Sequence, residues 1–385
     1  MRPLRSWLFI VAAALALAAS EAWAHKPSDS YLSLAADGAH IRGQWDIALR
    51  DLDAVLDLDR NHDARIDWGE VRTRAGEIDA YALAHLSLSV DAATCPLSVS
   101  DHLIDNHTDG AYVVLLLAGH CGRTIDALTV HYSLLFDVDA QHRGLLKLET
   151  RPSPASEPVI VTAVFPADRR RQTFALTGTS PWRQLGSFIA DGIAHIASGF
   201  DHILFLIALL LPAVLGRRGR TWFAVDDVRV ALWNVATTVT AFTLAHSITL
   251  SLATLHVVQL PSRLTESLIA LSVLVTAVDN LVPILPARRW VVAFVFGLMH
   301  GFGFASVLVD LNLPRSALAL SLFGFNVGVE IGQLVLVSLL VPLAYVARER
   351  RGYQRVALQG GSVLIAIIAF GWFAERSLDF KLMPF

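Results

Sequence analysis

The chain has 385 residues, of which 54% are hydrophobic and only 17% are charged, and its formal net charge is −3. The mean hydropathy of +0.51 excludes an ordinary soluble protein and predicts several membrane spans. The small net charge excludes few functions. The distribution of residue types along the chain is more informative, because apolar residues dominate after residue 185 while most Asp and Glu lie before it. We expect no nucleic-acid partner.

Residues 1–24 have the pattern of a cleavable secretory signal peptide. The basic residues Arg2 and Arg5 precede an apolar stretch over 7–19, and the small residues Ala22 and Ala24 flank a cleavage site. An uncleaved anchor is the alternative, although the apolar stretch is short for a membrane span. The pattern therefore predicts that the region after residue 24 is exported.

Residues 25–178 are polar enough to fold in water and are predicted to form an exported β-rich, sandwich-like domain. Hydrophobicity alternates with the two-residue period of strands in several short runs. These runs are 31–35, 41–49, 111–117, 127–136 and 159–165. Residues 52–85 are predicted to be helical instead, because their apolar positions do not alternate.

Residues 59–70 fit the twelve-residue calcium loop of EF-hand-like sites. The liganding positions of that loop are filled by Asp59, Asn61, Asp63, the Arg65 carbonyl, Asp67 and Glu70. One position departs from the pattern, since Ala64 replaces the glycine that permits the sharp turn. We expect calcium to stabilise the exported domain here, and a solvated acidic turn is the alternative.

Both cysteines of the chain, Cys95 and Cys121, lie in this exported part. An oxidising compartment favours a disulfide between them, and two free thiols or a paired metal site is the alternative. The histidines of this part are interpreted as surface or turn residues, because no two of them have metal-binding spacing within one evident helix. His102 and His107 come nearest to an exception.

Residues 179–385 are predicted to form an all-α polytopic membrane bundle of about six helices, which makes the chain a multi-domain protein. Each of six apolar stretches is near or above the roughly 20 residues that cross a bilayer. The predicted spans are 187–215, 230–255, 265–285, 290–309, 317–346 and 357–374. The lipid bilayer is therefore the first expected partner.

Basic residues between the spans indicate the orientation. Export of the N-terminal domain makes the first span run inward, and the loops then predicted to be cytoplasmic hold ten basic residues against four in the outer loops and tail. This asymmetry agrees with the positive-inside rule. We therefore expect a bacterial inner-membrane protein with its N-terminal domain and C-terminus on the periplasmic side.

Ionisable residues within the apolar segments are the main indication of function. A charged group at the bilayer centre costs roughly 3 kcal/mol or more, so several together indicate an ion or proton pathway. The candidate metal ligands are His195, Asp201, His202, His246, His300 and Glu330. The supporting polar residues are Glu266, Asp279, Asn326 and Gln333.

The first span carries His195 and His202 on one helix face, seven residues apart. A straight helix would separate them by roughly 10 Å, too far for both to bind one ion at about 2 Å. The helix must therefore unwind near Gly199, or the two histidines must serve successive sites. Asp201 after Gly199 suits a local break of the kind that surrounds ions in transporters.

Later spans add the remaining polar groups. Glu266 and Asp279 are thirteen residues apart and point to different sides of their helix, so we expect them to serve different places. Asn326, Glu330 and Gln333 recur at spacings of four and three residues, which places them on one face of the fifth span. Four imidazoles without a thiolate favour nickel, cobalt or zinc over magnesium or calcium.

Several segments of the membrane part resemble signature blocks of the HupE/UreJ family of bacterial membrane proteins, in its longer branch with a signal peptide and an exported domain. The segments are HIASGFDH, FTLAHSITL, ESLIALSV, FGLMHGFGFA and FNVGVEIGQ. The resemblance implies a nickel or cobalt permease. It implies that His195, Asp201 and His202 contact the metal, with His246, His300 and Glu330 in support.

Three functions remain open from the sequence. The first is a secondary transporter, not an enzyme, whose cargo is a divalent transition metal ion, nickel or cobalt before zinc. The second is an intramembrane zinc-dependent hydrolase, in which three histidines fix zinc and an acid activates water. The third is a metal sensor or assembly factor with a calcium-stabilised exported domain, and a periplasmic protein or metallochaperone is its expected partner.

Overall fold

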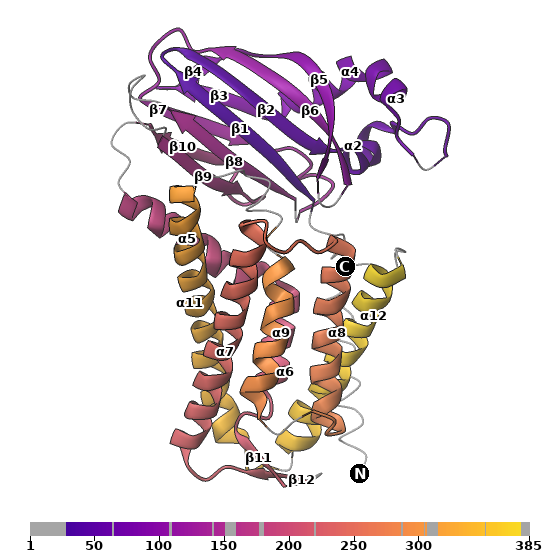
Figure 1. Cartoon of the computed structure of the whole chain (residues 1–385), viewed down its shortest axis with the longest axis vertical. Coiled ribbons are helices and arrows are strands. Elements are labelled where there is room, and N and C mark those ends of the chain that lie inside the picture. The colour runs from indigo at the N-terminus through magenta and orange to yellow at the C-terminus, as the bar shows by residue number, and fades with distance from the viewer. Residues whose placement is uncertain are drawn as a thin grey trace.

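A computed structural model describes residues 28–378 of the chain. The residues within this range that it does not describe are 64, 108–109, 141, 151–158, 177–180, 219–220, 286–287, 304, 306–314 and 351. The predicted signal peptide over 1–24 lies outside the described residues. A β-rich region, residues 28–175, sits on one end of a helical bundle, residues 181–378 (Figure 1).

Among the residues that the structure describes, ten strands build the β-rich region. They are β1 (Asp29–Asp37), β2 (His40–Ala48), β3 (Leu86–Val90), β4 (Ala93–Cys95), β5 (Leu97–His107), β6 (Gly110–His120), β7 (Ala127–Tyr132), β8 (Arg143–Thr150), β9 (Val159–Phe165) and β10 (Arg171–Ala175). One sheet has six strands in the order β5-β6-β2-β1-β8-β9, and the other has four in the order β10-β7-β3-β4. The β1–β8 pair is parallel, and the other pairs that join these strands are antiparallel.

The two sheets share one hydrophobic core, which confirms the predicted sandwich. Trp45 and Ile47 of β2 lie in the same buried cluster as Leu128 and Val130 of β7. Burial alternates along β7, as expected where one strand face meets a core and the other meets solvent. The runs of alternating hydrophobicity in the sequence therefore predicted the position of this two-sheet region correctly.

Three helices occupy the predicted helical segment: α2 (Leu49–Leu56), α3 (Trp68–Thr73) and α4 (Ala75–Ala84). The predicted calcium loop lies between α2 and α3. The backbone N–H of Asp63 donates to the side chains of Asp59 and Asn61, and Asp67 with Glu70 forms a capping box at the start of α3. Ala64 lies outside the described residues, and calcium binding stays a prediction.

A disulfide joins Cys95 and Cys121, as predicted. Deeper in the same region, a chain of buried polar side chains surrounds His142. Its Nδ1 lies 2.5 Å from the Ser28 hydroxyl and its Nε2 lies 2.5 Å from the Tyr132 hydroxyl, while Ser28 donates to Asp51 at 2.7 Å. Burial, with a smaller contribution from the nearby Arg143 charge, lowers the pKa of His142 to about 3.

This buried histidine should make the β-rich region sensitive to acid. An unfolded chain protonates His142 near pH 6.5, but the folded chain does so only near pH 3, so the stability it contributes above pH 6.5 is lost as the pH falls through that window. The loss reaches roughly 2–3 kcal/mol by pH 4.5. The raised pKa of buried Asp51 acts in the opposite direction.

Comparison with His142→Gln separates the two effects. The free energy of unfolding of the full chain is measured by chemical denaturation in detergent at pH 7 and pH 4.5. Between these two pH values, the wild type should lose roughly 2–3 kcal/mol of this free energy relative to the variant. A constant difference between the two proteins across this range would contradict the assignment.

The helical bundle contains α5 (Pro181–Ser198), α6 (Phe200–Leu210), α7 (Val228–Thr254), α8 (Ser262–Leu281), α9 (Arg289–Gly303), α11 (Arg315–Ala347), the π-helix η1 (Tyr353–Gly360) and α12 (Gly361–Leu378). Within the described part of the bundle, four helical stretches are long and apolar enough to cross a membrane: Val228–Thr254, Ser262–Leu281, Leu318–Ala347 and Tyr353–Leu378. The bent pair of α5 and α6 makes a fifth candidate span. The span predicted at 290–309 corresponds to α9, whose 15 described residues are too few to cross alone.

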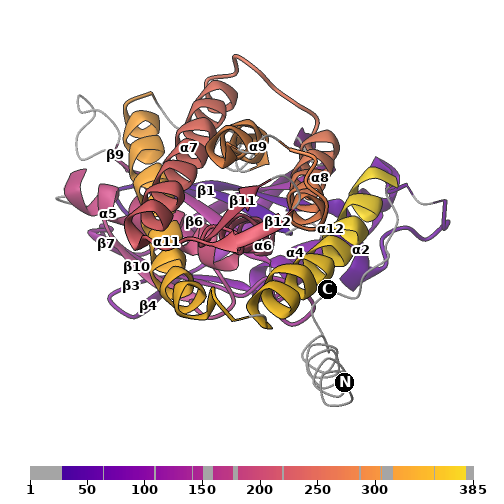
Figure 2. The same ribbon diagram turned by 90° about the horizontal axis from the view of Figure 1, so that it is seen from below.

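Seen along the bundle, the other helices surround α6 (Figure 2). A short hairpin, β11 (Leu215–Arg218) with β12 (Thr221–Ala224), lies at the end of the bundle opposite the sheets (Figure 1). We call this the hairpin end and the other the sheet end. The hairpin end holds Asp279, one of the predicted polar residues.

Candidate metal centre

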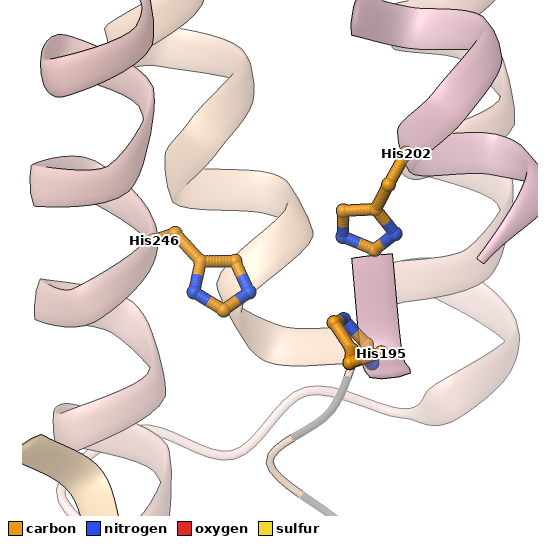
Figure 3. A group of neighbouring side chains, drawn as sticks. All are labelled: His195, His202 and His246. Atoms are coloured by element: carbon orange, nitrogen blue, oxygen red, sulfur yellow. The ribbon is translucent and has the colours of Figure 1, made fainter. Parts of the chain in front are cut away.

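Three of the predicted histidines come together inside the bundle from three different helices. His195 is on α5, His202 on α6 and His246 on α7, and their rings face a common space (Figure 3). One ligand nitrogen of each lies within 4.8 Å of the others. The ring centres of His195 and His202 are 4.6 Å apart, and each is 6.2–6.3 Å from that of His246.

A break in the first span makes this arrangement possible. The chain bends by 72° between α5 and α6, where Gly199 leaves the helical conformation with φ −79° and ψ 91°. A straight helix would hold His195 and His202 roughly 10 Å apart, so the bend supplies most of their approach. Of the two alternatives that the sequence left open, the structure has the break at Gly199, and the two histidines lie side by side.

Asp201 fixes the orientation of the His202 ring. Its Oδ1 accepts hydrogen bonds from the His202 backbone N–H at 2.8 Å and from the ring Nδ1 at 2.9 Å. A proton on Nδ1 leaves the lone pair on Nε2, which is the usual result of a carboxylate behind a metal-binding histidine. The other oxygen of Asp201 lies 4.0 Å from the guanidinium of Arg376 on α12.

His300 on α9 flanks the three histidines without joining the group. Its ring centre is 4.9 Å from that of His202, and its Nε2 lies 2.9 Å from the Ser272 hydroxyl on α8. Ser272 donates its own proton to the Ile269 carbonyl, so its oxygen accepts from His300. The lone pair of His300 is therefore on Nδ1, which has no hydrogen-bond partner among the described residues.

Ring nitrogens of His202 and His246 at the centre have no hydrogen-bond partner among the described residues. Within the described part of the chain, Nε2 of His202 and both nitrogens of His246 make no hydrogen bond. Asn326 lies near His246, but no hydrogen bond of acceptable geometry joins the two side chains. His246 is fully buried. Buried polar groups are nearly always paired, so unpaired imidazole nitrogens aimed at one space indicate a bound ligand.

Close helix packing positions two of these histidines. A side chain at Gly301 of α9 would collide with the His246 carbonyl and Thr249 of α7, and one at Gly297 would lie 2.7 Å from the Phe242 carbonyl. Only glycine lets the two backbones approach this closely. His300 lies between these two glycines in the sequence of α9. The close approach of α9 to α7 therefore determines the position of His300 beside His202.

The centre lies in the half of the bundle next to the sheets. His246 is 18 residues from the start of α7 and 8 from its end. A cavity of about 10 Å³, large enough for about one water molecule, lies beside His202 on the side of the hairpin end. Thr238 and Gln333 are the other polar residues that line it. Gln333 accepts a hydrogen bond from Thr243 at 2.9 Å. These polar groups continue from the histidines toward the hairpin end.

The other predicted polar residues lie elsewhere. Among the described residues, Glu330 is not in the three-histidine group, and the Glu266 carbonyl accepts a hydrogen bond from Arg376. Asp279 is at the hairpin end, where it accepts two backbone hydrogen bonds and pairs with Arg217 at 3.4 Å and Arg289 at 3.9 Å. Glu266 and Asp279 therefore lie near opposite ends of α8.

The family described as HupE / UreJ protein matches residues 170–376, more than half of the chain. The chain belongs to the HupE/UreJ family. The match in this HupE/UreJ protein covers the whole three-histidine centre together with Arg376 and Ser272, whereas most of the β-rich region lies before it. No curated protein matches the chain.

Sequence reasoning on this HupE/UreJ protein missed two residues that support the centre. Arg376 was counted only as a charge in the outer tail, and Ser272 carried no signal at all, since a serine within an apolar helix is common. Ser272 lies six residues after Glu266, which places the two on different sides of α8, and its partner His300 is on another helix. Such contacts between helices leave no local pattern.

Proposed function

We propose that this HupE/UreJ protein is a secondary transporter that carries a divalent transition metal ion, nickel or cobalt, across the bacterial inner membrane. The observation that carries the proposal is the meeting of His195, His202 and His246, from three helices, in a buried space among membrane-spanning segments. Imidazole nitrogen suits nickel, cobalt, zinc and copper, and the absence of thiolates from the membrane part of the sequence disfavours a soft ion.

The geometry fits an ion after a small contraction. Three nitrogens that bind one ion at about 2.1 Å lie roughly 3.4 Å from one another. The nitrogens here lie within 4.8 Å, so each ring needs to move inward by about 1 Å or less. The three imidazoles can therefore bind one ion after small side-chain movements.

The proposed route follows the polar groups through the bundle. With the β-rich region in the periplasm, as the arginine asymmetry favours, the ion enters from the sheet end and meets His202, His195 and His246. It then passes toward the cavity lined by Thr238 and Gln333. Asp279 with Arg217 and Arg289 closes the cytoplasmic end in the described conformation, so release requires these contacts to open.

Asp201 is the proposed orienting group of the site. Its bond to Nδ1 holds the His202 ring with Nε2 toward the centre, and its charge offsets that of an entering cation. The sequence contains no glycine-rich phosphate loop, so we propose that membrane potential or protons drive uptake. His300 supports the ring of His202, and Glu330 is proposed only as a more distant polar group.

Uptake of radioactive nickel or cobalt into vesicles that contain the purified full chain tests the function. We expect accumulation above empty vesicles, and a loss of at least tenfold in initial rate with His202→Ala, because the ion loses the one imidazole that a carboxylate orients. Bound zinc with hydrolysis of added lipid and no flux would favour the intramembrane hydrolase instead. Tight metal binding with neither flux nor hydrolysis would favour the sensor or assembly factor.

Calcium in the loop over 59–70 and a periplasmic protein partner for the β-rich region remain secondary proposals. The loop is flanked by helices α2 and α3, and its last two ligand positions, Asp67 and Glu70, cap α3, which supports the helix-loop-helix reading. Removal of calcium with a chelator should then lower the melting temperature of the full chain in detergent.

A further inference from the structure

Two exposed histidines form a pair on the outer face of the six-stranded sheet. His40 at the start of β2 lies directly opposite His120 at the end of β6 in the antiparallel register. Their ring centres are 4.7 Å apart with an angle of 44° between the ring planes. The two residues are 80 positions apart in the chain, so no spacing rule applied to the sequence could pair them.

We propose that His40 and His120 bind a divalent transition metal ion of the class that prefers imidazole: nickel, cobalt, zinc or copper(II). An ion bound to one nitrogen of each ring at about 2.1 Å, with a near-tetrahedral angle, places the ring centres roughly 5 Å apart. The observed 4.7 Å matches this separation before any ion is added. The ring centres therefore already stand at the separation that a shared ion requires, and rotation of each ring about its Cβ–Cγ bond can turn a nitrogen toward the ion.

The backbone beneath the pair is held in place. Cys121, the residue after His120, donates its N–H to the carbonyl of Ala39, the residue before His40, at 2.8 Å. Cys121 is also tied to Cys95 by the disulfide. The Cα positions of both histidines are thus fixed by a hydrogen bond and a covalent link, which lowers the entropy lost when an ion joins the rings.

An acidic residue completes the row. Asp37 at the end of β1 lies directly opposite His40, so Asp37, His40 and His120 stand side by side on three adjacent strands and share one face. All three are exposed, which leaves the remaining coordination positions of an ion open to water. The carboxylate adds a negative charge beside a site for a cation.

This pair is separate from the histidines of the bundle. Asp29, at the other end of β1, pairs with Arg143, whose charge interacts with His195. The nine residues of β1 span roughly 30 Å, so His40 lies at the end of the sheet away from the bundle. The inference rests on the sheet geometry alone and does not require that the bundle transports metal.

Calorimetric titration of the detergent-solubilised full chain with nickel, repeated with copper(II), tests the site. We expect wild type to bind one more ion per chain than His40→Ala/His120→Ala, and each single variant to weaken that binding event at least tenfold. His256→Ala, which changes an exposed histidine outside the β-rich region, is the control and should bind as wild type does.

Two results would overturn the inference. One is an unchanged number of bound ions in the double variant whose unfolding midpoint without metal equals that of wild type. The other is the same loss of binding in His256→Ala. Because His202→Ala and His246→Ala leave the sheet intact, an effect confined to those variants would concern the bundle and the proposed transport only.

Discussion

Replacing His246 with alanine is expected to lower the initial rate of nickel or cobalt uptake at least tenfold, with a larger loss at limiting metal concentration. The ring contributes one of three nitrogens that lie within 4.8 Å, and neither of its nitrogens has a partner in the described part of the protein. Substitutions that only disturb the support of a metal ligand already cost 10–100-fold in affinity. Removal of a ligand itself should cost no less.

His246→Ala should lower the stability of the protein by little enough that its uptake rate can be compared with that of the wild type. Because the ring makes no hydrogen bond within the described residues, His246→Ala removes packing without leaving a donor or acceptor on a neighbour unpaired. Thermal unfolding in detergent checks that the variant is folded, and the uptake rate of vesicles with matched protein content gives the effect.

His256→Ala is the matched control for His246→Ala. His256 follows the same helix α7, is exposed, and bonds only to Gln259 among the contacts described for its ring. Its variant should transport at the wild-type rate. Normal uptake by His246→Ala, or an equal loss of uptake in both variants, would show that the transported ion does not pass through the three-histidine centre.

The sequence was sufficient for the layers of the fold because each follows from a local period. Alternation located β1, β2, β6, β7 and β9, and long apolar runs located the helices of the bundle. The sequence did not predict β3, β4 and β10, which are short, or β5, which carries polar residues on both faces. It also missed the eight-residue β8, which pairs with β1 in parallel. Their place is decided by pairing with distant strands, which no window of sequence contains.

The candidate centre was predictable in its members but not in its geometry. The cost of burying ionisable groups identified His195, His202 and His246, and the glycine before Asp201 indicated the break that brings the first two together. Whether His300 or Glu330 joins them depends on how α9 and α11 pack, and that packing is set by contacts between helices. The exposed pair of His40 and His120 arises in the same way from strand register.

Glycine packing between α5 and α11 leads to the second large effect. A side chain at Gly192 of α5 would collide with the Phe325 carbonyl and approach the Val329 nitrogen of α11 to 2.9 Å, while one at Gly328 would collide with the Ile189 carbonyl. These are backbone atoms, so no change of rotamer relieves the overlap. The two glycines therefore fix the distance between the helices.

Gly192→Leu is accordingly expected to push α5 away from α11 and to carry His195, three residues further along α5, out of reach of His246. Uptake should be lost to the level of empty vesicles, and the melting temperature in detergent should fall by several degrees, since overpacking typically costs about 1–3 kcal/mol or more. Uptake and thermal unfolding on the same preparations measure both effects.

Gly186→Leu separates this packing effect from the general effect of a leucine in α5. Gly186 lies on the same helix, is exposed, and has no atom within 4 Å of the position of an added Cβ. Both substitutions change helix propensity equally, so only the contact with α11 differs. Gly186→Leu should keep wild-type uptake and stability; if the two variants behave alike, the close approach of α5 to α11 is not what holds His195 in the centre.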